Sequence, residues 1–342
     1  MSPISARTAE ALASVLGQFG IRDASFHDIR TGRVNKHWRV ESTAEAYVLR
    51  RYNKHRSLPA IQYEHAVLRH IAAKGWPVAP PLPATHRSDG LVEIDGGHYA
   101  LFPLLPGSPS SHHSVPQARL KGQLLARLHE DLATWEPPGQ REGFGRMWEL
   151  DVFVAAQSRY ATFNELLMAF GQEHTELARA IRSQKYAMLR ELSTLGYGEL
   201  PAVLGHFDFH EDNLLFQHGE LTGLLDFDFV HLDARVADIA ESIALGCLAP
   251  PAYNEIDIAA LRAFIGGYTE HTPLSDADAQ LIVPLLRAAI VWMVQWRLSQ
   301  WAEGEHGDEP LRSIQRSVSA RFPGLARRRD ELEAAVLQAA GA

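Results

Sequence analysis

The chain has 342 residues, of which 46% are hydrophobic and 22% charged, and these proportions are ordinary for a soluble globular protein. The length allows two domains or one large two-lobed unit. Asp and Glu outnumber Lys and Arg by 41 to 33, a formal charge of −8, so nucleic acid is disfavoured as the main partner, whereas a cationic substrate is compatible with the charge.

The first hundred residues predict a small antiparallel sheet with one main helix. Helical spacing over 8–18 is followed by β-like runs at 24–29, 36–41 and 46–52. An amphipathic helix follows over 58–74, and Gly75 closes it. The runs 90–94 and 98–101 flank Asp95-Gly96-Gly97 and predict a hairpin. Together these elements form the first predicted lobe.

The composition changes after this sheet. Prolines, a glycine and serines at 102–111 end the strand pattern, and helices dominate from residue 117 onward. We therefore predict two lobes, 1–105 and 106–342, and an α+β fold. Helices are expected near 117–134, 151–170, 174–194, 234–245, 257–269, 276–302 and 309–339, and β-like runs only at 203–206, 214–217 and 221–225.

Three features indicate the compartment. The single cysteine, Cys247, excludes an intrachain disulfide and fits a reducing environment. Residues 1–12 lack the basic region and apolar core of a signal peptide. The longest apolar run, 281–296, is interrupted by Pro284 and Arg287 and is short for a bilayer span, so it predicts a buried helix. We expect a cytoplasmic protein with no membrane partner.

Three polar residues stand at a spacing that suits phosphoryl transfer. Asp208 precedes Asn213 by five residues, and Asp226 follows thirteen residues later. A turn near His218-Gly219 would fold the two β-like runs into a hairpin and bring Asp226 back beside Asn213. In phosphoryl transfer from a nucleotide, one carboxylate orients and deprotonates the attacking hydroxyl, while an amide and a second carboxylate hold magnesium.

The surroundings of the second carboxylate also favour a metal. Asp226 and Asp228 lie among Leu and Phe in the segment 224–229. Burying carboxylates there is costly unless a cation or hydrogen bonds compensate. Any one of these residues would fit a turn or a cap equally well, so the indication comes from the whole set and its spacing.

The pattern His206-x-Asp208-x-His210-x-x-Asn213 followed by Asp226 resembles the aminoglycoside phosphotransferase and choline kinase superfamily, small-molecule relatives of protein kinases. Weaker matches agree in order: the 48–50 strand, the 63–68 helix, the 104–107 hinge and the leucine-histidine helix at 125–129. The chain looks most like the branch that includes type II homoserine kinases. The resemblance implies a two-lobed protein-kinase-like fold that uses ATP and Mg²⁺ to phosphorylate a small-molecule hydroxyl.

The resemblance also implies roles for the motif residues. Asp208 would be the catalytic base, and Asn213 and Asp226 would bind magnesium. His206 would pack beneath the loop and fix it, and Asp238 would be the family's structural aspartate. Four residues are thus expected in supporting positions: His206, His210, Asp228 and Asp238.

The nucleotide-binding residues are expected in the first lobe. The family's strand lysine is replaced here by Arg50 or Arg51, and strand parity with Val48 favours Arg50. Glu64 would pair with that arginine. The loop 31–35 is not Gly-x-Gly-x-x-Gly, and Asn35 is its candidate for nucleotide contact. The adenine would meet the backbone of three hinge residues: Pro103, Leu104 and Leu105.

Two other chemistries use the same residue types. Alternating His206, Asp208 and His210 could bind the metals of a dinuclear hydrolase, with further ligands such as His231 and Asp233. The helical remainder of the chain does not fit such folds. Asp-x-Asp at 226–228 could serve a glycosyltransferase, but no doubly wound αβ alternation precedes it.

The acceptor is the open question, and an amino alcohol, a homoserine-like or an aminoglycoside-like molecule is expected. Trp292 and Trp296 could enclose a quaternary amine, although tryptophans at this spacing more often pack a core. A stress-response-type Ser/Thr protein kinase and a weakly catalytic nucleotide-binding module remain alternatives, and the oligomeric state is not readable. Three acids could bind an amine, although each is more often a surface or capping residue: Glu149, Asp151 and Glu241.

Overall fold

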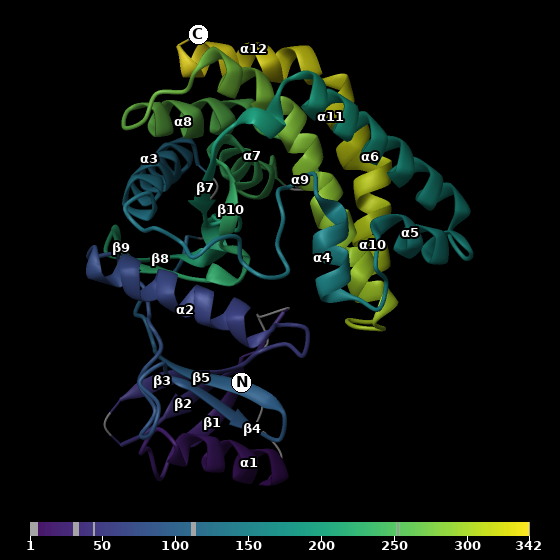
Figure 1. Ribbon diagram of the computed structural model, residues 1–342. Coiled ribbons are helices and arrows are strands. Elements are labelled where there is room, and N and C mark those ends of the chain that lie inside the picture. Colours follow the sequence, from purple (N-terminus) through teal and green to yellow (C-terminus); the bar gives the residue numbers. More distant parts are fainter. Residues whose placement is uncertain are drawn as a thin grey trace. The chain divides into compact units, whose positions relative to one another are not determined.

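The computed structural model describes residues 6–29, 34–43, 45–110, 114–250, 252 and 254–341. The chain divides into two compact units (Figure 1). The first consists of Met1–Pro109 and Leu214–Leu225, and the second of Ser110–Asn213 and Asp226–Ala342. Residues 31–33 of the predicted nucleotide loop 31–35 lie outside the described residues.

The first unit is built on a five-stranded antiparallel sheet in the order β1 (Ser25–Ile29), β2 (Lys36–Glu41), β3 (Ala46–Arg51), β5 (Gly97–Pro103) and β4 (Leu91–Ile94). Helix α1 (Ala6–Gly17) packs Leu12, Val15 and Leu16 on one face of this sheet. Helix α2 (Leu58–Ala73) lies on the opposite face (Figure 1). Since side chains alternate along a strand, Leu49 meets the α1 face and Arg50 the α2 face.

A small three-stranded sheet also belongs to the first unit. Its order is β6 (Ser108–Pro109), β8 (Leu214–Gln217) and β9 (Glu220–Leu224). Leu224 N donates to Pro77 O at 2.8 Å, and the Thr222 hydroxyl donates to Pro106 O at 2.7 Å. The two compact units differ from the predicted lobes in two respects. The first unit extends to Pro109, and it includes the 214–225 hairpin that we expected in the second lobe.

The second unit is mostly helical and is organised around α9 (Asp276–Ala302), as Figure 1 shows. A capping box of Ser275 and Asp278 starts this helix. The helix is long and apolar enough to cross a membrane, but 67% of its most apolar stretch is buried inside the protein. That burial identifies it as a core helix, as predicted. The other long helices are α3 (Val115–Leu132), α6 (Thr175–Thr194), α7 (Arg235–Gly246) and α8 (Ile258–Thr269).

Two predicted helices are interrupted. The 151–170 segment forms α4 (Leu150–Gln157) and α5 (Phe163–Gly171), because Ser158 ends the first helix and Thr162 caps the second. The 309–339 segment forms α10 (Glu309–Arg316), a π-helical turn η4 (Ser317–Arg321), α11 (Phe322–Arg327) and α12 (Arg329–Ala340). Pro323 stands in the first turn of α11, where a proline is tolerated although it would break a continuous helix.

Strand β10 (His231–Ala234), which lies beside the motif, was not predicted. It pairs with β7 (Ala202–Gly205) in antiparallel register, and Gly205 lies opposite His231. The sequence of β10 contains no β-branched residue, so its extended form comes from this pairing and not from local preference. The two strands place the segments 206–213 and 226–230 beside each other within the second unit.

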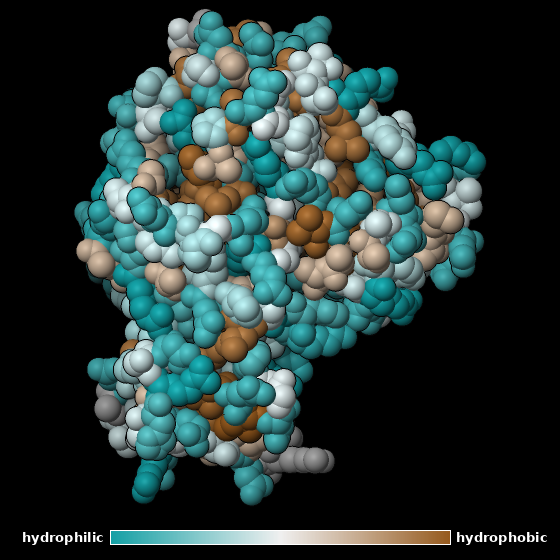
Figure 2. Space-filling model, in the orientation of Figure 1, coloured by the Kyte–Doolittle hydropathy of each residue, from teal (hydrophilic) through white to brown (hydrophobic). Residues whose placement is uncertain are grey.

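The surface visible in Figure 2 is largely hydrophilic, and its hydrophobic residues form small separate patches. Scattered exposed apolar side chains are normal on a water-soluble protein.

Candidate active site

A buried aspartate fixes the loop that follows β7. Asp238 on α7 accepts hydrogen bonds from His206 N at 2.6 Å and from Phe207 N at 2.9 Å. The His129 imidazole, 2.9 Å away at Nε2, completes its set of partners. Burial favours the neutral acid, but these donors and the nearby histidines outweigh it and lower the pKa of Asp238. The predicted structural aspartate therefore holds the start of the motif.

The same bonds support an uncommon backbone conformation. Phe207 has φ of +55°, in the left-handed region that bulky residues rarely adopt. Its ring stacks on His231 with centroids 4.0 Å apart, and His231 stacks on Phe144 at 5.2 Å. His206 is fully buried and packs edge-on against Phe227. These ring contacts fix the backbone before Asp208 and so orient that residue.

Asp208 lies at the centre of a hydrogen-bonded group. Asn213 Nδ2 donates to Asp208 Oδ2 at 2.8 Å and to Asp208 O at 2.9 Å. His210 Nε2 lies 3.3 Å from Asp208 Oδ1. Burial opposes the charge on His210, but the hydrogen bond to Asp208 and the charges of Asp208, Glu211 and Asp212 raise its pKa to about 8. A positively charged His210 orients the Asp208 carboxylate through this contact, and general-base chemistry requires an oriented carboxylate.

The hairpin brings the two predicted metal ligands together at one end. Leu214 pairs with Leu224, so Asn213 and Asp226 flank the same open end of β8–β9. The two-residue turn His218-Gly219 has positive φ at both positions, as a tight hairpin turn requires. Asp226 itself has φ of +59°, a conformation that aspartate tolerates better than most residues.

An arginine that the sequence did not reveal clamps the loop after Asp226. Arg141, only 1% exposed, donates from Nη1 to the carbonyls of Phe227 at 3.0 Å, Asp228 at 2.9 Å and Val230 at 3.2 Å. It comes from the loop between α3 and α4, where an arginine is usually solvated. By donating to three backbone carbonyls, the buried arginine satisfies their hydrogen bonding, which secondary structure would otherwise do, and so holds the loop in place.

The donor set at the end of the hairpin fits a hard divalent cation. Because Asn213 Nδ2 is bonded to Asp208, the amide oxygen is left to face another partner. Carboxylate and amide oxygens are the ligands that Mg²⁺ prefers. Among the described residues there is no cluster of three or more His, Cys, Asp or Glu that could bind a metal. A site with so few protein ligands suits Mg²⁺, which keeps several waters and is bound mainly through substrate phosphates.

The first unit contains the expected arginine–glutamate pair. Arg50 Nη1 donates to Glu64 Oε1 at 2.7 Å, and the Glu64 side chain is 1% exposed. Arg50 Nε also donates to His37 Nε2 at 3.0 Å. Arg51 points to the other face of the strand, where its guanidinium lies 5.8 Å from the Tyr99 ring. Arg50 and not Arg51 therefore pairs with Glu64, on the strand face that parity indicated, and its contact with the nucleotide stays a prediction.

The other first-unit candidates have structural partners of their own. Asn35 is 4% exposed, and its Oδ1 accepts Asn53 N at 2.9 Å, so its side chain braces β2 against the end of β3. Leu104 N donates to Ala46 O at 3.3 Å, next to Pro103 at the end of β5. Of the three hinge residues, Leu105 has the backbone N–H that is not used by another described residue.

The dinuclear-hydrolase reading does not agree with the positions of its extra ligands. Asp233 accepts the Tyr197 hydroxyl at 2.6 Å, Met147 N at 2.7 Å and Arg146 Nε at 3.0 Å. Nδ1 of His231 lies 2.6 Å from Phe229 O. Asp233 is thus engaged in the fold, and His231, 3% exposed, is stacked between the Phe207 and Phe144 rings.

Trp292 and Trp296 of α9 pack against aromatic side chains of the second unit. Trp292 lies 4.8 Å from the Phe153 ring and 5.1 Å from Phe229, and Trp296 lies 6.3 Å from Phe229. Phe229 follows Asp228 directly. These contacts agree with helix packing, the commoner role of tryptophans at this spacing.

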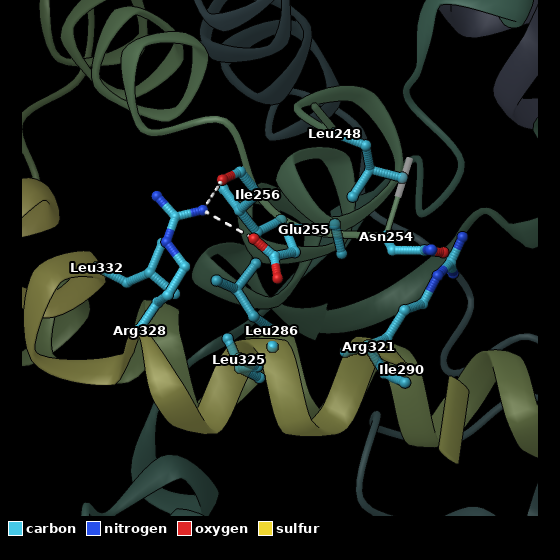
Figure 3. A pocket seen from close by; sticks show the side chains of 12 residues that line it. Leu248, Asn254, Glu255, Ile256, Leu286, Ile290, Arg321, Leu325, Arg328 and Leu332 are labelled. Atoms are coloured by element: carbon cyan, nitrogen blue, oxygen red, sulfur yellow. Dashed lines mark hydrogen bonds and ion pairs between the residues drawn. The ribbon is translucent and has the colours of Figure 1, made fainter. Parts of the chain in front are cut away.

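A pocket between α7, α9, α11 and α12 lies outside the motif (Figure 3). Arg321, Arg328, Asn254 and Glu255 contribute its polar groups, and Glu255 pairs with Arg328 at 3.7 Å. Its cavity volume of about 20 Å³ admits roughly one water molecule. This cavity is too small to hold an acceptor substrate.

Comparisons with known proteins identify the family and the fold. The sequence profile of the "Phosphotransferase enzyme family" matches residues 25–274. The chain is 28% identical to a homoserine kinase of Xanthobacter autotrophicus over 285 residues, which is 83% of each chain. Its fold is similar to a microcompartment-associated aminopropanol kinase, with a TM-score of 0.67, 17% identity and coverage of 97% and 99%. It is also similar to an amicoumacin kinase solved with AMP-PNP and Ca²⁺, with a TM-score of 0.66, 16% identity and 96% coverage of both chains.

Proposed function

Because the chain belongs to the phosphotransferase enzyme family, a family of two-lobed kinase-like enzymes, we propose that Asp208 is the catalytic base of a small-molecule kinase. The protein is a phosphotransferase that acts on a hydroxyl of a small molecule and binds ATP. The residue roles, the metal and the acceptor class are the proposal. The observation that carries it is the bonded group of Asp208, Asn213 and His210 at the open end of the β8–β9 hairpin.

Each motif residue has a separate proposed role in phosphoryl transfer. Asp208 accepts the proton of the attacking hydroxyl and orients it, since its carboxylate is already held by Asn213 and His210. Asn213 and Asp226 are the proposed Mg²⁺ ligands. Bound Mg²⁺ neutralises charge on the transferring phosphoryl group. Arg141 and Asp238 do not meet the substrate, because they act on the backbone that carries these groups.

The first-unit residues are proposed to bind the nucleotide. Arg50 is held by Glu64, so its guanidinium presents a fixed fork of donors to phosphate oxygens. The Leu105 backbone N–H is the proposed adenine contact, since Leu104 N is occupied by Ala46 O. Asn35 accepts Asn53 N beside the ends of β2 and β3, and its contact with the nucleotide is part of the proposal.

We propose an amino alcohol or a homoserine-like compound as the acceptor. Homoserine and aminopropanol, the compounds in the names of the two kinases above, both carry an amine near a hydroxyl. The net charge of −8 is compatible with a cationic acceptor. The buried single cysteine and the buried α9 helix agree with a cytoplasmic enzyme.

The test compares Asp208→Asn with Asp212→Asn. Asp212 is the neighbouring acid, and its side chain is 80% exposed. We expect Asp208→Asn to lower kcat by about 1,000-fold or more, since a catalytic base contributes 10²–10⁴-fold, while the Kd for ATP changes little. Asp212→Asn should keep normal turnover. Unchanged turnover in Asp208→Asn, or loss of ATP binding, would contradict the role of Asp208.

A further inference from the structure

Glu241 on α7 is a buried carboxylate without a protein counter-ion. The residue is 6% exposed, and no hydrogen bond or ion pair to it occurs within the described part of the chain. Burial and the carboxylates of Asp208, Asp238 and Asp233 all act in one direction and raise its pKa well above the ordinary value. Charged groups are rarely buried in this way unless a partner is added.

The two other acids considered as amine ligands have local explanations. Asp151 Oδ1 accepts Phe163 N at 2.8 Å at the start of α5. Glu149 Oε2 accepts Arg146 N at 2.7 Å in the turn before α4. Both therefore serve the backbone near them, as caps and turn acids do. Glu241 has no such bond, and its position needs a different reason.

The position of Glu241 follows from the contacts of α7 with the catalytic loop. One turn earlier, Asp238 binds His206 N and Phe207 N. At the end of the helix, a Cβ on Gly246 would lie 3.1 Å from Glu211 Oε2. Residues three apart share one face of a helix, so Glu241 lies on the face of α7 that carries Asp238 toward the loop. Asp208 is accordingly the largest charge that acts on it.

The carboxylate of Glu241 has no bonding partner among the described residues, and 6% of the residue is exposed to solvent. Its oxygens are also not among the described polar atoms that are fully enclosed and lack a hydrogen bond. An ammonium ion is the partner that would satisfy a carboxylate surrounded by other carboxylates, because it supplies both charge and N–H donors.

We propose that Glu241 binds the ammonium group of an amino-alcohol acceptor whose hydroxyl is directed toward Asp208. This assignment rests on the proposed function and adds to it a specificity residue, which selects acceptors with an amine close to the hydroxyl. The carboxylates of Asp208 and Glu241 then take opposite ends of one small molecule. Asp208 receives the hydroxyl proton, and Glu241 holds the cation.

The experiment uses pairs of acceptors that differ only in the amine. L-Homoserine is compared with 4-hydroxybutanoate, and 3-aminopropan-1-ol with propane-1,3-diol. For each pair, kcat/KM is measured with the wild-type chain, Glu241→Gln and the control Glu149→Gln. Glu241→Gln should lower the ratio of amine to non-amine kcat/KM by about 100-fold, as expected when one partner of a buried charge pair is lost. Glu149→Gln should leave this ratio unchanged.

The outcomes separate this inference from the function it rests on. A wild-type enzyme that phosphorylates diols as well as amino alcohols, or a Glu241→Gln enzyme with an unchanged ratio, would overturn the role of Glu241 alone. Wild-type chain that phosphorylates no acceptor would contradict the proposed function and with it this assignment. The melting temperature of Glu241→Gln should not fall, since the change removes a charge that has only like charges nearby. A large fall would indicate a structural role instead.

Discussion

Replacing Asp238 by Asn tests how the catalytic loop is held. The aspartate is completely buried and has three partners: His206 N, Phe207 N and the His129 imidazole. Asn has one acceptor oxygen in place of two, so at least one of the two backbone N–H groups loses its acceptor. The replacement also removes the negative charge from every bond that survives.

The magnitude follows from these bonds. A buried donor left unsatisfied costs about 1–3 kcal/mol, and each remaining bond loses about 1 kcal/mol of charge assistance. We therefore expect the free energy of unfolding to fall by about 3–4 kcal/mol. The positive φ of Phe207 costs roughly 1–3 kcal/mol by itself and would lose its support. Asp208 would then be misdirected, and kcat should fall by about 100-fold.

The assay combines denaturant unfolding with steady-state kinetics, and Asp257→Asn is the matched control. Asp257 also accepts two backbone N–H groups, from Ala259 at 2.8 Å and Ala260 at 3.2 Å, but it caps an exposed helix start. Since Asn caps helices about as well as Asp, this control should change stability by less than about 0.5 kcal/mol. An equal and small effect of both changes on stability and kcat would show that Asp238 does not hold the catalytic loop.

Three further predictions follow from the site and its supports. His65 has a pKa lowered from 6.5 to about 3, chiefly by burial, so its contribution to stability is complete above pH 6.5 and is lost as the pH falls toward 3. His65→Gln should flatten this part of the stability–pH curve, which spans at most about 5 kcal/mol, in chemical denaturation from pH 7 to 3. Arg50→Met should raise the KM for ATP by about 10- to 100-fold, since charge-assisted bonds are lost, whereas an equal rise in Arg51→Met would contradict the assignment. Asparagine tolerates the positive φ of position 226, so Asp226→Asn tests the carboxylate alone. This change should raise the Mg²⁺ concentration for half-maximal activity by at least about 10-fold, and an unchanged Mg²⁺ titration would exclude Asp226 as a ligand.

The motif was predictable because its geometry is local. The polar residues Asp208, Asn213 and Asp226 lie within nineteen positions, and the tight turn at His218-Gly219 brings the last of them back beside the second. Hydrophobic alternation likewise indicated β1 to β5, and parity along β3 separated Arg50 from Arg51. Short-range patterns determine such features, so a single sequence contains them.

The supports of the site could not be predicted because they come from distant segments. Arg141 reaches the 227–230 carbonyls from a glycine- and proline-rich loop. Nothing in the sequence of that loop distinguishes this arginine from an exposed one. β10 is extended because β7 pairs with it. The 214–225 hairpin belongs to the first unit through bonds to Pro77 and Pro106, which lie more than a hundred residues away. Only tertiary contacts decide these features.

The central claim is that this chain transfers phosphate from ATP to the hydroxyl of a small amine-bearing acceptor. The most direct measurement is a ³¹P NMR spectrum of the purified chain with ATP, Mg²⁺ and 3-aminopropan-1-ol or L-homoserine. We expect a new phosphomonoester signal that grows in step with ADP and is absent with Asp208→Asn. ADP accompanied only by inorganic phosphate, or phosphate transferred to protein, would contradict it.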